Sequence, residues 1–338
     1  MIRALVINDV HLAASPPMGC TERYTDDIKN MLVEARQYAR DNDCAYTIFT
    51  GDFFHSKRGT PPGLIRWAME TLQEWPGRKL AIVGNHDQSY RGLDSIPDQP
   101  IGLLFQEGAL EWLREDIVTC DRISTPDGPT ISTDLFIQWS PANYFPEIDH
   151  DPANFSLTRR HAQMQQPMPR DDARSVDWAV KIAHGTITPP GKPFPYHTVP
   201  MDTIDTTGMD ICLYGHPHYD VGLNEVNGCT FVCLGSLGRT QANEDEYGRV
   251  MRLLQVQFGK DDFFLDELLL GSAAPATELF LAKSAKGHDE DRALSRLMKH
   301  IDATTLIEQG SVDEVLATLP GDGRAKKRLV DYLQKAGL

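Results

Sequence analysis

Residues 3–11 read RALVINDVH, and the stretches YTIFTGDFFH at 46–55 and KLAIVGNHD at 79–87 follow the same plan of an apolar run that ends in polar residues. Apolar runs this short are typical of buried strands. Segments with helical periodicity at 25–42 and 62–75 separate the three runs. The order strand, helix, strand, helix, strand predicts an α/β fold in which parallel strands carry helices on the sheet.

The middle of the chain is expected to consist mainly of strands. Their predicted positions are 134–139, 178–183, 211–214, 230–234 and 250–258. Between the first two, the composition of residues 141–174 predicts a loop that is exposed around 164–169.

Within the first predicted helix, at 25–42, Thr25 is expected to supply the N-cap.

The pattern changes after Gly271. The predicted helices in this part span residues 289–301, 312–319 and 326–335. We therefore expect a main domain at 1–271 and a small appended region at 272–338, which caps the site or binds a partner. Residues 272–338 hold ten acidic and ten basic side chains, so the whole formal charge of −15 belongs to residues 1–271.

Composition excludes several classes of protein. An acidic chain with 33 Lys and Arg against 48 Asp and Glu is not a simple electrostatic nucleic-acid binder. Bound metal ions can nevertheless supply the positive charge for work on phosphates. No stretch is long and apolar enough to span a membrane, and no secretory signal is recognisable. The six cysteines form no CxxC pair, so we expect reduced thiols and a cytoplasmic location.

Polar residues that can bind metals follow five predicted strands. They occur as DVH at 9–11, GDFFH at 51–55, GNHD at 84–87, HG at 184–185 and GHPH at 215–218. Because ligands bind outside the carboxyl ends of strands in open α/β sheets, the five clusters are expected to converge. Each cluster alone has an ordinary explanation as a polar turn or a surface histidine. Their joint occurrence in this order favours a shared site.

The residue types suit two divalent ions. Asp9, His11 and His218 can hold one ion, and Asn85, His184 and His216 can hold the other. Asp52 is the natural bridge, because one carboxylate can offer an oxygen to each ion. Two such ions clamp a phosphate and activate a bridging water for in-line attack. A donor set without thiolate suits Mn, Fe or Zn and argues against Ca.

The series DVH, GDFFH, GNHD, HG and GHPH resembles the calcineurin-like metallophosphoesterases over roughly residues 1–240. The resemblance implies two packed mixed β-sheets flanked by helices, with a dimetal site at one edge. It also implies the same seven metal ligands, none of which is missing: Asp9, His11, Asp52, Asn85, His184, His216 and His218.

Two segments narrow the resemblance. GDFFHSKR at 51–58 and LGSLGR at 234–239 are similar to the SbcD-type DNA repair nucleases. This implies an exonuclease and endonuclease that acts on DNA in double-strand break repair or recombination, with manganese as the metal. The alternative is a stand-alone phosphodiesterase for cyclic nucleotides or other small diesters, against which His55 argues, since many such enzymes have Asp at that position. A module that only holds DNA ends is disfavoured by the complete ligand set.

Three further residues are candidates for catalysis. His86 is not needed as a ligand, so it can protonate the leaving oxygen as general acid. Asp87 is expected to orient His86, although it can also cap the following turn. The resemblance implies that His55 contacts the substrate phosphate.

The resemblance also implies partners. They are DNA, an SbcC-type ABC ATPase and a second copy of the chain, with helices after the second and third motifs at the dimer interface. Trp67 and Trp75 fit such an interface, but packing on their own sheet is the simpler expectation. Candidate DNA contacts are Lys57, Arg58, Arg159, Arg160, His161, Arg170 and Arg174, and each is also explained as a solvated surface charge. The run RAKKR at 324–328 leads into the last predicted helix, which either contacts DNA or a partner or folds onto the body of the chain.

Overall fold

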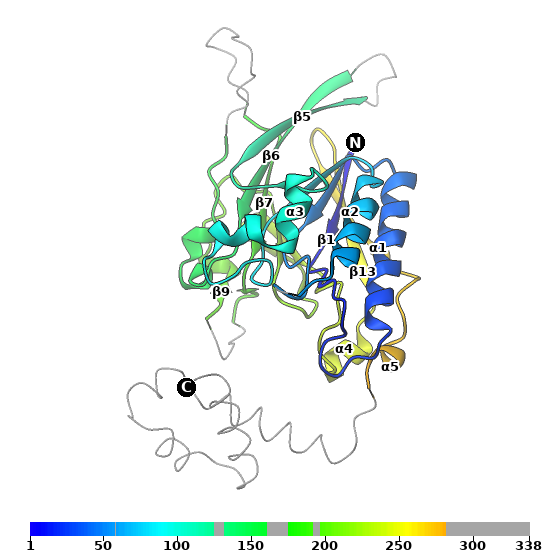
Figure 1. Cartoon of the computed structure of the whole chain (residues 1–338). Helices are drawn as coiled ribbons and strands as arrows, with labels where there is room; N and C mark the ends of the chain where they lie inside the picture. The colour runs from blue at the N-terminus through cyan, green and yellow to red at the C-terminus, as the bar shows by residue number, and fades with distance from the viewer. Residues whose placement is uncertain (58, 125–131, 161–174, 192–196, 282–338) are drawn as a thin grey trace, which may run out of the picture. The chain divides into compact units, whose positions relative to one another are not determined.

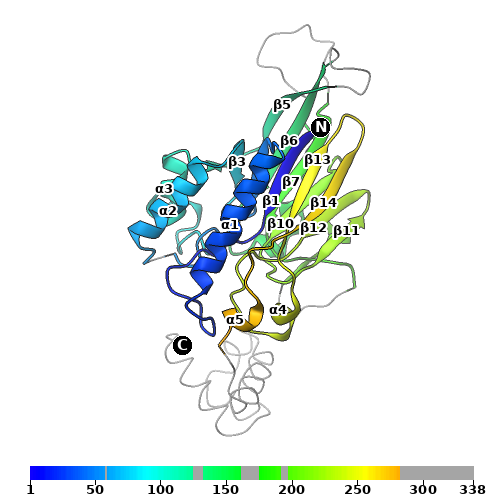
Figure 2. The same cartoon turned by 90° about the vertical axis from the view of Figure 1, so that its right-hand side faces the viewer.

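The computed structural model describes residues 1–57, 59–124, 132–160, 175–191 and 197–281. Its first compact unit, Met1–Phe280, contains two six-stranded sheets that pack face to face (Figure 1 and Figure 2). One sheet has the order β14 (Phe263–Leu269), β13 (Arg252–Phe258), β1 (Ile2–Ile7), β2 (Tyr46–Phe49), β3 (Arg78–Ala81) and β4 (Glu111–Trp112). The other has the order β11 (Gly222–Val226), β12 (Cys229–Cys233), β10 (Ile211–Gly215), β7 (Trp178–His184), β6 (Ser132–Ala142) and β5 (Ile117–Ser124).

Both sheets are mixed. Strands β1, β2, β3 and β4 run parallel, whereas β13 and β14 are antiparallel additions. In the second sheet β6, β7, β10 and β12 run parallel, and β5 and β11 form antiparallel edges. The carboxyl ends of the parallel strands therefore collect the loops that carry the polar clusters. The predicted fold class, two packed mixed sheets flanked by helices, is confirmed.

Helices cover the outer face of the first sheet (Figure 2). The α-helices are α1 (Tyr24–Asp41), α2 (Pro62–Gln73), α3 (Pro100–Gln106), α4 (Glu244–Gly248) and α5 (Ala276–Leu279). Short 3-10 turns are η1 (Leu93–Asp98), η2 (Ile148–His150), η3 (Pro152–Phe155) and η4 (Met201–Thr203), and β8 (Ile187–Thr188) pairs with β9 (Val199–Pro200). None of the described helices is long and apolar enough to cross a membrane.

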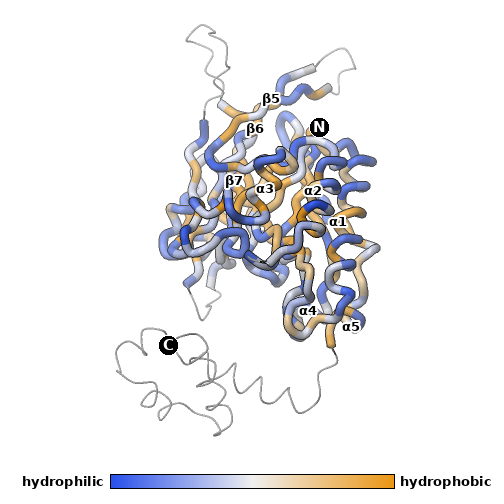
Figure 3. Tube along the Cα trace, in the orientation of Figure 1, coloured by the Kyte–Doolittle hydropathy of each residue, from blue (hydrophilic) through white to orange (hydrophobic). Residues whose placement is uncertain are grey.

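Alternation along β1 shows how the layers form. Ala4 and Val6 point between the sheets, into the core that contains Trp139, while Leu5 and Ile7 point to the helices. From Ala4 to Ile7, β1 thus has an apolar side chain at every position, as expected for a strand that is covered on both faces. Along α1 hydrophobic and hydrophilic residues alternate, in keeping with one buried face (Figure 3).

The elements expected before residue 271 are present with shifted ends, and the expected cap is wrong. The N-cap of α1 is Arg23, whose side chain makes no capping bond. The Thr25 hydroxyl instead donates to the Ala13 carbonyl oxygen at 2.7 Å, so it fastens the helix to the loop that leaves the site. Strands β4, β5, β11 and β14 were not expected. All four are edge strands of the two sheets, and their apolar patterns are therefore weak.

The simpler expectation for the two tryptophans is confirmed. Trp75 is 3% exposed, and its indole Nε1 donates to Thr47 Oγ1 at 2.8 Å. Trp67 packs on the same core, with the Lys29 ammonium 5.2 Å from its ring centroid. All six cysteines are free, in keeping with the expected reduced thiols.

Several expectations fall outside the described residues. These are the loop around 164–169, the helices after residue 288, the basic run at 324–328, and the candidate DNA contacts Arg58, His161, Arg170 and Arg174. The division into 1–271 and 272–338 therefore stays a prediction. Two other candidate contacts are engaged in ion pairs, Arg159 with Asp210 and Arg160 with Asp116.

Candidate metal centre

The side chains that the sequence singles out come together within the first unit, where the carboxyl ends of parallel strands lie. Asp9 and His11 follow β1, Asp52 follows β2 and Asn85 follows β3. His184 ends β7, and His216 and His218 follow β10. Two sheets thus contribute to one cluster, because the carboxyl ends of their central strands meet there.

One group of donors surrounds His11. Its Nε2 lies 2.9 Å from His218 Nε2 and 3.6 Å from Asp52 Oδ2. These three side chains can hold one metal ion. The structure thus brings together His11 and His218, two of the three residues expected to hold the first ion.

A second group surrounds His184. Its Nε2 lies 3.0 Å from Asn85 Oδ1 and 3.5 Å from Asp52 Oδ2, and His216 Nδ1 lies 3.1 Å from the same Asn85 oxygen. Asp52, His184 and His216 can hold a second ion. Asp52 belongs to both groups, which is the arrangement that a bridging carboxylate requires.

Two buried oxygens show that the donor set fits cations. Asp9 Oδ2 and Asp52 Oδ2 are buried and have no hydrogen-bond partner. The other oxygens of these carboxylates accept backbone N–H groups, Asp9 Oδ1 from His216 at 2.9 Å and Asp52 Oδ1 from His86 at 2.7 Å. An unpaired buried carboxylate oxygen is costly, and a divalent cation would compensate for it. Asp9 Oδ1 lies 3.6 Å from His184 Nδ1, next to the cluster, and its role as a metal ligand stays a prediction.

The backbone at the site is strained. Asp9, His11, Asp52 and His216 have positive φ angles of 37°, 48°, 51° and 93°, which non-glycine residues rarely adopt. Such strain concentrates at functional sites, where the surrounding structure enforces it. Gly84 makes room in addition, because a Cβ there would lie 2.2 Å from Asp52 Oδ1.

Burial sets the protonation of the imidazoles. It lowers the pKa of His216 to about 3 and that of His218 to about 4, so both are neutral near pH 7, the form that binds metal. Burial acts in the same direction on His184, but the carboxylates of Asp52 and Asp9 outweigh it and raise the pKa to about 9.

Two histidines are held by groups outside the ligand set. His184 Nδ1 lies 2.8 Å from the Thr50 carbonyl oxygen, which can only accept, so Nδ1 carries the proton and Nε2 is free for metal. His218 Nδ1 lies 3.1 Å from Thr240 Oγ1, which directs His218 Nε2 to the site in the same way. Thr240 is 22 residues after His218, and no pattern in the sequence marked it.

We expect Thr240→Val to weaken binding of one metal ion by about ten- to a hundredfold, the usual loss for a group that orients a histidine ligand. Valine keeps the shape of the side chain and removes the hydroxyl. Metal titration followed by calorimetry measures the effect, and Thr240→Ser, which keeps a hydroxyl, is the matched control. Equal affinities for all three proteins would contradict this role.

His86 and His55 form the rim of the cluster. Their rings stack, with centroids 5.3 Å apart, and the His86 ring lies 4.9 Å from that of His11. His86 Nδ1 donates to the His55 carbonyl oxygen at 2.6 Å, which leaves Nε2 available to a substrate. His55 Nδ1 lies 3.4 Å from His11 Nδ1. Both residues are therefore placed to contact a substrate that binds at the metal centre.

The expectation for Asp87 is corrected. This side chain is 2% exposed, and its Oδ1 accepts the Phe53 N–H at 3.0 Å while its Oδ2 accepts the Gly84 N–H at 3.0 Å. It thus ties the loop after β2 to the loop after β3. The group that orients His86 is the His55 carbonyl oxygen instead.

Tyr144 is a neighbour that sequence reasoning missed. It follows β6, and its ring centroid lies 5.9 Å from that of His184 and 5.8 Å from that of His216. Gln88 Nε2 donates to its carbonyl oxygen at 2.8 Å. No sequence motif around Tyr144 indicates its contact with the two histidines, because only the sheet topology brings the end of β6 to the site.

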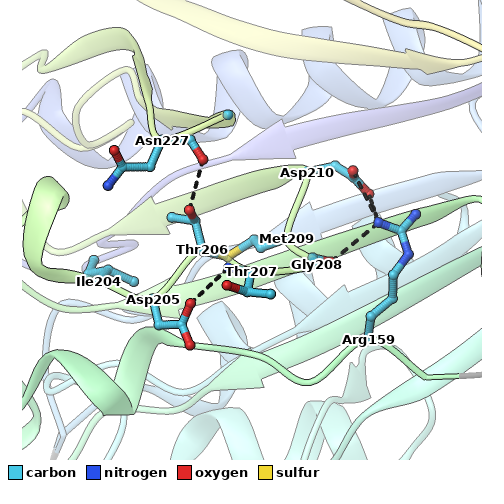
Figure 4. A pocket seen from close by; sticks show the side chains of 10 residues that line it. Arg159, Ile204, Asp205, Thr206, Thr207, Gly208, Met209, Asp210 and Asn227 are labelled. Carbon is cyan, nitrogen blue, oxygen red and sulfur yellow. Dashed lines mark hydrogen bonds and ion pairs between the residues drawn. The ribbon is translucent and has the colours of Figure 1, made fainter.

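Two surface hollows differ in their relation to the site. A cavity of about 300 Å³ opens directly beside the metal centre and includes Asn85, His86, His216 and His218 in its walls. Another hollow, of about 540 Å³, lies before β10 and contains the Arg159–Asp210 pair (Figure 4). Its walls share no residue with the metal centre, and only the first cavity adjoins the chemistry.

Comparison with known proteins adds one family match. The family model of the calcineurin-like phosphoesterases matches residues 2–220. Among solved structures, calcineurin-like phosphoesterase YfkN from Bacillus subtilis is similar, with 14% identity, a TM-score of 0.47, and coverage of 81% of this chain and 92% of that chain. A novel archaeal phosphodiesterase is similar at 12% identity and a TM-score of 0.36, with coverage of 79% and 100%. No curated protein matches the chain.

Proposed function

The chain belongs to the calcineurin-like phosphoesterase family, whose members hydrolyse phosphoesters with bound metal, and we propose that within this family it is a DNA exonuclease and endonuclease. The observation that carries the proposal is the pair of buried carboxylate oxygens, Asp9 Oδ2 and Asp52 Oδ2, that accept no hydrogen bond and lie among four converging imidazoles. A site built this way binds cations and then an anionic ester.

Each residue has a distinct task in this proposal. The seven ligands are Asp9, His11, Asp52, Asn85, His184, His216 and His218. When bound, two divalent ions supply the Lewis acidity and positive charge that phosphodiester hydrolysis needs. His55 binds a phosphate oxygen, and His86, held through Nδ1 by the His55 carbonyl oxygen, donates a proton from Nε2 to the leaving oxygen.

The segment LGSLGR at 234–239, on which the resemblance to SbcD-type nucleases partly rests, lies against the metal loops. Its backbone braces the metal loops: Leu237 N–H donates to the Asn8 carbonyl oxygen at 2.9 Å, and Ser236 N–H donates to the His218 carbonyl oxygen at 3.1 Å. Gly238 packs so tightly that a Cβ there would lie 2.8 Å from the Val10 carbonyl oxygen. A segment similar to that of SbcD-type nucleases thus takes part in shaping the site, and so does His55 from GDFFHSKR.

The electrostatics give the metals a second role. With a formal charge of −15 and two of the candidate cations engaged in ion pairs, the chain needs bound ions to attract DNA. We propose manganese as the activating metal, with iron or zinc as substitutes. An SbcC-type ATPase, a second copy of the chain and a cytoplasmic location complete the proposal.

The test is hydrolysis by the metal-stripped chain after addition of Mn, Fe or Zn. The substrates are bis-p-nitrophenyl phosphate, labelled duplex DNA and cyclic nucleotides. We expect manganese to restore cleavage of both the small diester and DNA. Turnover of cyclic nucleotides without DNA cleavage would replace this proposal with the small-substrate phosphodiesterase, and inertness with every metal would overturn both.

A further inference from the structure

The residues that line the cavity of about 300 Å³ beside the metal centre fall into two sets. One set belongs to the metal site, namely Asn85, His86, His216 and His218. The second set, here called the outer lining, includes Tyr219, Thr240, Gln241, Asn243 and Glu246. A group that leaves from a phosphate at the metal centre, on the side of His86, would enter this space.

The outer lining suits an uncharged ligand with many hydrogen bonds. Among the described residues that line the cavity there is no lysine or arginine to bind a second phosphate, and the Glu246 carboxylate is paired with Arg249. Side-chain amides such as that of Gln241 offer a donor and an acceptor together, which match the edge of a nucleobase.

The outer lining is held in place by a buried ion pair and by hydrogen bonds. Arg249 and Glu246 form an ion pair at 2.9 Å, with side chains 6% and 4% exposed. Arg249 Nη1 also donates to the Ser236 carbonyl oxygen at 2.6 Å, and Asn243 Oδ1 accepts the Glu246 N–H at 2.9 Å. Together with the hydrogen bond between Thr240 and His218, these contacts hold the residues around the cavity in place.

We propose that this cavity binds the base of the nucleoside that leaves from the scissile phosphate, and that Gln241 is its specificity-determining residue. The inference rests on the proposed function, because it assigns a nucleoside to the leaving side of the same reaction. Gln241 is exposed, follows the ordered Thr240, and contributes no ligand to the metal centre.

The experiment compares two dinucleotides that differ only in the leaving residue, which carries a base in one and is an abasic sugar in the other. Their leaving oxygens have the same chemistry, so the ratio of the two kcat/KM values reports recognition of the base. We expect the wild-type ratio to be about ten or more, and Gln241→Ala to lower it by about tenfold, the lower range for one bidentate contact to a base. The ratio does not depend on the fraction of folded enzyme.

Gln37→Ala is the matched control, because Gln37 is an exposed glutamine on α1 whose partner is Asp41. It should leave the ratio unchanged. A wild-type ratio near one, or a ratio that Gln241→Ala does not alter, would overturn the inference while hydrolysis of bis-p-nitrophenyl phosphate left the proposed function standing. If no diester is hydrolysed at all, the proposed function fails and this inference fails with it.

Discussion

Asp52→Asn is expected to lower phosphodiester hydrolysis by about a thousandfold, the upper range for loss of one group that stabilises transition-state charge. Asp52 is fully buried, and its Oδ2 lies 3.6 Å from His11 Nε2 and 3.5 Å from His184 Nε2. The amide keeps the shape and can still accept the His86 N–H through Oδ1. It removes the negative charge and presents N–H groups to positions where two cations would bind.

Metal content tests the bridge independently of activity. We expect the wild-type chain to bind two manganese ions and to gain thermal stability from them, because a ligand that binds only the folded state raises its stability. Asp52→Asn should bind fewer ions and show a smaller rise in Tm. Asp94→Asn, which changes an exposed carboxylate in η1, is the control and should behave as wild type. Two ions with unchanged affinity in Asp52→Asn would contradict a bridging role.

The convergence of the ligands could be predicted because it follows from strand direction. Asp52 and Asn85 lie just beyond neighbouring parallel strands, so the topology fixes their proximity once the strands are recognised. The same holds for His184 and His216, which end or follow the parallel strands β7 and β10. Short apolar runs with polar ends carry all of this information.

Contacts across the site could not be predicted in this way. Asp87 binds the Phe53 N–H, 34 residues earlier in the chain, because the loops after β2 and β3 lie side by side. Thr240 reaches His218 and Tyr144 reaches His184 for the same kind of reason. From the sequence alone, such side chains are expected to bond to backbone groups of the nearest turn. Only the assembled loops show which distant group they bond to instead.

Thr25 shows the same limit within a helix. Its hydroxyl is typical of an N-cap, yet the helix begins one residue earlier and the hydroxyl binds the Ala13 carbonyl oxygen. The loop between β1 and α1 returns to the start of the helix and presents that acceptor. A cap preference of about 1 kcal/mol is easily overridden by such a tertiary hydrogen bond.

His86→Asn is expected to separate two classes of substrate. Asparagine can still donate to the His55 carbonyl oxygen, which His86 Nδ1 contacts at 2.6 Å, so the rim of the site should keep its shape. It cannot supply the Nε2 proton. Loss of a general acid costs about 10²- to 10⁴-fold when the leaving alkoxide needs that proton.

The choice of substrate makes this prediction sharp. DNA releases a basic alkoxide, whereas bis-p-nitrophenyl phosphate releases a stable anion that needs no proton in the transition state. We therefore expect His86→Asn to lose DNA cleavage by about 10²-fold or more and to lose far less on the p-nitrophenyl ester. Metal content should equal that of wild type, and His150→Asn, a change of an exposed histidine that packs on His197, is the matched control.

The pattern of the two losses distinguishes the possible roles of His86. Equal losses on both substrates would mean that His86 binds the phosphate group and does not protonate the leaving oxygen. A loss of bound metal would make it a ligand, for which its position beside the His11 ring leaves room. Only a large loss on DNA with a small loss on the activated ester, at full metal content, fits a proton donor to the leaving oxygen.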